Sequence, residues 1–76
     1  MKVEDWGVDR LIAALVARTQ VSAVFSVLTH RVKNGEIDDE ELSALVEMLM
    51  EHYKPREVPR TLKEAMAREM ELRFGK

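Results

Sequence analysis

The chain has 76 residues, no cysteine, and a formal net charge of −2 from 12 Lys and Arg against 14 Asp and Glu. This length predicts a single domain over residues 1–76, and the lack of cysteine excludes disulfide bonds and thiolate zinc sites. Small domains without disulfide bonds or a structural metal commonly rely on a second copy of the chain for stability. We therefore expect a homo-oligomer, most simply a dimer.

Composition also bears on source and location. One asparagine (Asn34) and one glutamine (Gln20) occur beside many charged residues, a balance typical of thermophilic proteins. The acidic residues Glu4, Asp5 and Asp9 follow Lys2. This charge does not fit a signal peptide, so we expect a cytoplasmic location. A membrane span over Leu11–Thr29 would place Arg18 near its centre, at a cost of about 3 kcal/mol. We expect no membrane partner.

The first helical segment covers roughly Val8–Lys33 and contains two apolar stripes. Over Leu11–His30 the only charged residue is Arg18. At about 100° per residue, the two stripes lie on nearly opposite sides of a helix. The chain either bends near Arg18–Gln20 or forms one long helix with two buried faces. No Gly or Pro marks a break, which favours the long helix. The second stripe is then predicted to contact a partner copy, through Val21, Val24, Phe25 and Leu28.

The second helix is amphipathic and begins at an Asp38 or Asp39 cap. It ends before Pro55, because the residue preceding a proline avoids helical angles. Its buried stripe comprises Leu42, Leu45, Val46, Leu49 and Tyr53. Met48 and Met50 flank Leu49 and lie partly off this stripe. Because methionine side chains adapt readily to partners, we predict that these two belong to a contact surface.

A connector over residues 54–60, with Pro55 and Pro59, is expected to be extended. A third helix follows it, with the capping-box pattern Thr61 to Glu64 at its start and Met66 and Met70 on its buried side. The sequence thus predicts an all-α chain of three helices. A helix-turn-helix built from helices two and three does not fit, because that motif needs a turn of three or four residues.

The sequence contains little that indicates catalysis or metal binding. It lacks a cysteine nucleophile and a Gly-rich phosphate loop, and its two histidines, His30 and His52, fall at different levels of the expected helices. The run from Asn34 to Leu42 resembles the second half of an EF-hand calcium loop. His30 and Val32 stand where that loop needs oxygen ligands. We predict no catalytic residues, metal site or cofactor.

Two functions remain. The leading hypothesis is a non-enzymatic structural or regulatory protein that acts as a homo-oligomer through protein–protein interaction, with another protein as a further partner. The alternative is a small dimeric nucleic-acid-binding regulator. In that alternative, phosphates contact four basic residues of the connector and the start of helix three, namely Lys54, Arg56, Arg60 and Lys63.

Overall fold

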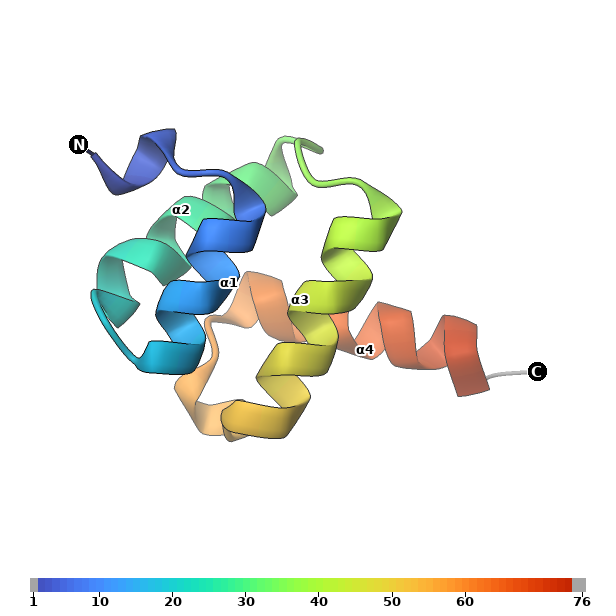
Figure 1. The fold of residues 1–76 in the computed structure, drawn as a ribbon. Helices are drawn as coiled ribbons and strands as arrows, with labels where there is room; N and C mark the ends of the chain where they lie inside the picture. Colours follow the sequence, from blue (N-terminus) through green and yellow to red (C-terminus); the bar gives the residue numbers. More distant parts are fainter. Residues whose placement is uncertain (1, 75–76) are drawn as a thin grey trace.

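A computed structural model describes residues 2–73 in full and the backbone of Phe74. This part of the chain is helical and contains no strand, so the all-α prediction is confirmed (Figure 1). It forms four α-helices rather than three, together with two short 3-10 helices. In chain order these are η1 (Val3–Asp5), α1 (Val8–Ala17), α2 (Val21–Lys33), α3 (Asp39–His52), η2 (Pro55–Glu57) and α4 (Arg60–Phe74).

The prediction of one long N-terminal helix is wrong, because the chain turns sharply between α1 and α2. Arg18 and Gln20 both adopt left-handed backbone angles, with φ of 57° and 49°. The Arg18 and Thr19 N–H groups close α1 by donating to carbonyls of its last turn. Left-handed angles cost a non-glycine residue about 1–2 kcal/mol each. The turn allows the apolar stripes of both helices to face one core, and each fully buried Leu or Val contributes about 1.5–3 kcal/mol.

All four α-helices contribute to one connected apolar core. Its most deeply buried side chains are Leu11, Leu15, Val24, Leu28, Leu45, Leu49 and Leu62, each with at most 1% of its surface exposed. The rings of Phe25 and Tyr53 meet edge to face in this core, with centroids 5.4 Å apart. The expected amphipathic stripes of α2 and α3 are therefore satisfied within the chain.

Figure 1 shows α1 and α3 side by side, with most of α2 to the left of and behind α1. The α4 helix crosses behind and below them, packing against both α2 and α3. Its C-terminal half continues beyond α3, so the molecule is elongated, measuring 43 Å along its longest axis. This projecting half of α4 has few neighbours to cover its apolar side chains.

The start of α3 agrees with the sequence prediction, whereas the connector does not. Asp38 caps α3: its side chain accepts a 2.8 Å hydrogen bond from the Glu41 N–H, and the Asp38 N–H donates to Glu41. The connector is not extended throughout, because residues 55–57 form η2. The fourth helix already begins at Arg60, so Thr61 lies inside it, and Glu64 pairs with Arg60 at 3.5 Å instead of completing a capping box.

Candidate functional site

The single charge of the apolar run, Arg18, joins the α1–α2 turn to the end of α3. Its Nη2 donates a 2.7 Å hydrogen bond to the His52 carbonyl, and its guanidinium carbon lies 4.3 Å from the centroid of the Tyr53 ring. Its Nη1 is 3.5 Å from Glu57. The Tyr53 hydroxyl completes this junction by donating a 2.6 Å hydrogen bond to the buried Leu15 carbonyl. These contacts give Arg18 a structural role.

The surroundings of Glu57 lower the pKa of its carboxyl. A 2.8 Å hydrogen bond from the Lys54 backbone N–H lowers the pKa of the Glu57 carboxyl below its ordinary value of 4.5. The nearby Arg18 guanidinium lowers the pKa further, whereas partial loss of water raises it. The carboxylate thus holds η2 in place beside Arg18 and does not indicate proton chemistry.

The residues predicted to contact a partner fall into two groups. Val24, Phe25 and Leu28 are buried in the chain's own core, at 0%, 6% and 0% exposure. Met48 is also buried, and Val21 is half-buried against the core. Their apolar spacing correctly indicated burial, but the turn at Arg18–Gln20 directs the stripe of α2 inwards rather than towards a second chain. Met50 is the exception, with 46% of its surface exposed.

Met50 lies in a groove between α3 and α4, which we call the α3–α4 groove. It has a volume of about 290 Å³ and is lined by Val46, Glu47, Met50, Glu51, Met70 and Arg73. Met70, which we expected in the core, is 41% exposed here. Arg73 spans the groove, with Nη2 donating to the Ser43 hydroxyl and lying 3.4 Å from Glu47 Oε2. The groove thus has an apolar floor, an acidic α3 wall and a basic residue on α4.

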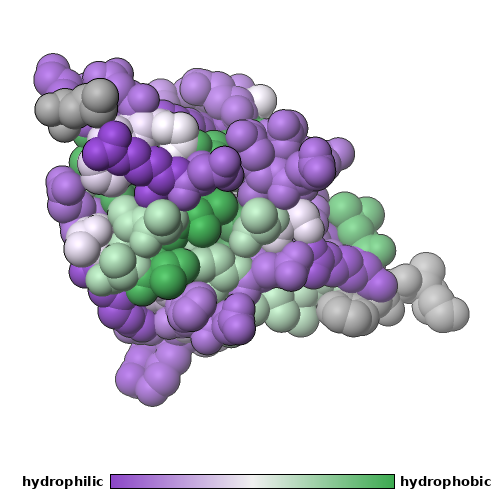
Figure 2. Space-filling view, viewed as in Figure 1, coloured by the Kyte–Doolittle hydropathy of each residue, from purple (hydrophilic) through white to green (hydrophobic). Residues whose placement is uncertain are grey.

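Sequence reasoning missed Met70 and Leu72 as surface residues. Leu72, on the projecting part of α4, is 74% exposed. Figure 2 shows a second apolar patch, over α1, where Val16 is 47% exposed beside the exposed Ala13 and Ala17. Helical periodicity marks Met70 as apolar-facing, but it does not reveal that the groove between α3 and α4 stays open beside Met70.

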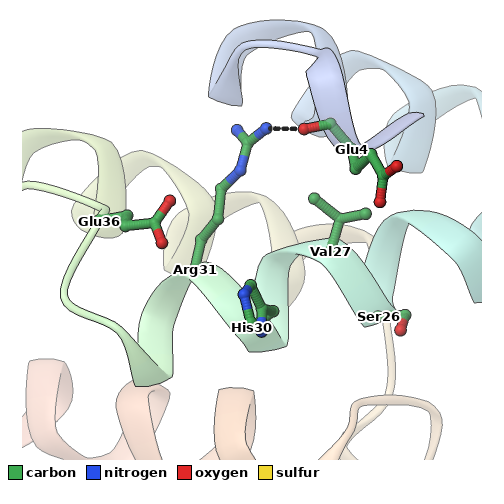
Figure 3. Close-up of a pocket in the computed structure, with 6 residues that line it drawn as sticks. All are labelled: Glu4, Ser26, Val27, His30, Arg31 and Glu36. Atoms are coloured by element: carbon green, nitrogen blue, oxygen red, sulfur yellow. Dashed lines mark hydrogen bonds between the residues drawn. The ribbon is translucent and has the colours of Figure 1, made fainter. Parts of the chain in front are cut away.

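A larger hollow, of about 570 Å³, lies along α2 beside η1 (Figure 3). Its lining residues are Glu4, Ser26, Val27, His30, Arg31 and Glu36. Val27 and Arg31 point towards η1, where Arg31 donates a 2.8 Å hydrogen bond to the Glu4 carbonyl, whereas Ser26 and His30 point away from η1. The His30 Nε2 is 2.9 Å from the Asn34 side-chain nitrogen. The lining of this hollow carries both charges, and Arg31 already donates to the Glu4 carbonyl. The hollow therefore does not form an anion site.

The four residues predicted to contact phosphates are all on the surface. Lys54 and Arg56 lie at η2, and Arg60 and Lys63 lie on the first turns of α4. Arg60 is partly neutralised by Glu64, with 90% of its side chain exposed. Because Arg18 contacts both His52 and Glu57, this basic segment begins next to the α1–α2 turn.

Residues 2–74 include no helix with the length and apolar character needed to cross a bilayer. Over the same residues, no group of three or more His, Asp or Glu side chains is arranged to hold a metal ion. No protein-family model, curated protein or solved structure matches this chain. The exposed residues of the chain are therefore the guide to its function.

Proposed function

We propose that this protein is a small non-enzymatic interaction protein that acts as a homodimer, with the α3–α4 groove at the centre of the dimer interface. The observation that carries the proposal is the exposure of two methionines, Met50 and Met70, in one groove of a chain with little core to spare. Flexible thioether side chains suit a surface that repacks against a partner.

The charges around the groove favour a second copy as the occupant. In a twofold dimer each surface patch meets itself, so every contact from one copy to the other occurs twice. Glu47 and Glu51 line the α3 side, and Arg73 lines the α4 side. Rotating one copy by 180° about an axis parallel to the groove brings the acidic α3 wall of each copy against Arg73 of the other. The groove is thus complementary to itself.

A stable dimer interface is larger than the groove, so the proposed interface also includes part of α4. Specific dimers bury about 800 Å² on each copy, about 15% of the 5213 Å² accessible surface here. The apolar side chains of the groove do not supply that area alone. The projecting half of α4, with Leu72 at 74% exposure, continues from the groove and provides further apolar surface. We therefore include the end of α4 in the interface.

The test is sedimentation equilibrium of the full chain over about 1–500 µM, the range in which weak interfaces dissociate. We expect a species of twice the 8.8 kDa chain mass. Met50→Glu and Met70→Glu should each weaken the dimer at least about tenfold, because each would bury a carboxylate in an apolar interface that already contains Glu47 and Glu51.

Val16→Glu is the matched control, since Val16 is as exposed as Met50 but lies in the α1 patch. This variant should remain dimeric. A wild-type monomer at the highest concentration would contradict self-association. Loss of the dimer in Val16→Glu, with Met50→Glu unaffected, would move the interface to α1. Far-ultraviolet circular dichroism confirms that each variant is folded.

A further inference from the structure

We propose that α1, the Arg18–Gln20 turn and α2 form a helix-turn-helix unit that binds duplex DNA, with α2 entering the major groove. The connectivity is that of this motif, because two helices are joined by a turn of three residues. Helices α3 and α4 do not fit the motif, because η2 and its flanking residues separate them. The inference is independent of the proposed dimer.

One face of α2 packs into the core, and the opposite face is exposed to solvent. Val24, Phe25 and Leu28 anchor the helix at no more than 6% exposure. Ser22, Ser26, His30 and Lys33 form an exposed row at spacings of four, four and three residues. In Figure 3, Ser26 and His30 point away from η1. A recognition helix needs this arrangement, in which rigid packing on one side presents side chains on the other.

The exposed row has the size and chemistry for base edges. Ser22, Ala23 and Ser26 are small, so the α2 backbone can approach the floor of the major groove closely. Serine hydroxyls donate and accept hydrogen bonds, and a histidine ring adds a donor or acceptor further along. The B-DNA major groove is about 12 Å wide and admits a helix, whereas the A-form RNA groove is too narrow.

Charge supports a polyanionic ligand on this side. Residues 18–33 contain three basic residues and no acidic one. Arg18 contacts Glu57 and Arg31 donates to the Glu4 carbonyl, so Lys33 is the residue of this segment that we assign to a phosphate. The η2 and early α4 region adds Lys54, Arg56, Arg60 and Lys63 against Glu57 and Glu64, of which Glu64 pairs with Arg60. This region borders α2, because η2 adjoins the α1–α2 turn and α4 packs along α2.

Acidic residues are concentrated elsewhere. Residues 34–53 hold seven acids and no Lys or Arg. Most of these acids lie on α3, which packs on α1 and α4. Glu4 and Glu36 border the α2 row on its η1 side. On the α4 side of α2, Lys33 shares a hollow with Asp39 and Glu64. The phosphate backbone is expected to run along this side, where Lys33 and the four residues of the predicted phosphate site outnumber Asp39, Glu57 and Glu64.

The test is fluorescence anisotropy of the full chain with a labelled mixed-sequence duplex of about 24 base pairs, long enough for a helix to occupy the groove. If Lys33, Lys54, Arg56 and Lys63 each neutralise one phosphate, log K falls with log salt at a slope of about −3.6. Raising salt from about 50 to 200 mM then weakens binding about 150-fold. Lys54→Gln should reduce the slope by about 0.9.

Ser26→Glu should abolish duplex binding, because it places a carboxylate on the face that enters the groove. Ala44→Glu is the matched control, since it adds the same charge at an exposed position on α3. Equal duplex affinity for these two variants would overturn the proposal. So would absence of wild-type binding at low salt, or tighter binding to a single strand of the same length. Met50→Glu, which is designed to weaken the dimer, should leave the slope of log K against log salt unchanged for each chain.

Discussion

Gln20 offers the sharpest test of the turn between α1 and α2. Its backbone is left-handed, with φ of 49° and ψ of 40°, and its side chain makes no capping hydrogen bond. Replacing it with glycine removes a conformational penalty without removing a capping hydrogen bond. Replacing it with alanine truncates the same side chain but retains a Cβ. The stability difference between Gln20→Gly and Gln20→Ala therefore isolates the backbone conformation.

The expected magnitude follows from the two competing geometries. Alanine in the left-handed region costs about 1–2 kcal/mol, and the greater freedom of unfolded glycine offsets part of this. We expect Gln20→Gly to be more stable than Gln20→Ala by about 1 kcal/mol. Inside a continuous helix, glycine would instead be less stable than alanine by about 1 kcal/mol. The two geometries therefore predict opposite signs.

Thermal unfolding monitored by circular dichroism resolves this difference. A 76-residue chain has an unfolding entropy of roughly 160 cal/mol/K, so 1 kcal/mol corresponds to about 6 °C in Tm. Urea unfolding at fixed temperature provides a second measure of the free energy of unfolding. A higher Tm for Gln20→Ala than for Gln20→Gly would refute the turn and restore the single long helix.

Two further predictions concern the junction around Arg18. Tyr53→Phe removes the 2.6 Å hydrogen bond from the Tyr53 hydroxyl to the Leu15 carbonyl, although this carbonyl still accepts from the Arg18 N–H. We therefore expect the free energy of unfolding in urea to fall by about 1 kcal/mol. An unchanged free energy of unfolding would contradict a role for this hydrogen bond. Glu57→Gln should lower Tm at neutral pH, because the carboxylate accepts from the Lys54 N–H. Since folding lowers the pKa of Glu57, its contribution is present above about pH 4.5 and lost as pH falls through the folded pKa. The Tm gap between wild type and Glu57→Gln should therefore narrow on acidification, and a gap independent of pH would contradict this.

Local signals predicted some elements well. The start of α3 at Asp38 depends on a side chain and an N–H three residues apart, and its end depends on the proline two residues beyond Tyr53. Such signals act over a few residues and are legible without knowledge of the fold. They failed at α4, where the Thr61 to Glu64 pattern lies inside a helix that begins at Arg60.

The candidate sites were predicted less well, for two physical reasons. The spacing of Val24, Phe25 and Leu28 shows that one face of α2 is buried but not which surface covers it. The same pattern suits a partner chain or the chain's own α1 and α4. Met70 likewise carries the apolar spacing of α4, but it lines the open α3–α4 groove and remains 41% exposed.

By itself, the sequence determined the helical class, the start of α3 and which apolar stripes are buried, because these follow from local hydrogen bonding and periodicity. Only the tertiary structure decided the turn at Arg18–Gln20 and the resulting exposure of one face of α2. Neither residue favours left-handed angles by its own chemistry. The turn forms because burying both stripes in one core yields more free energy than the two strained residues cost.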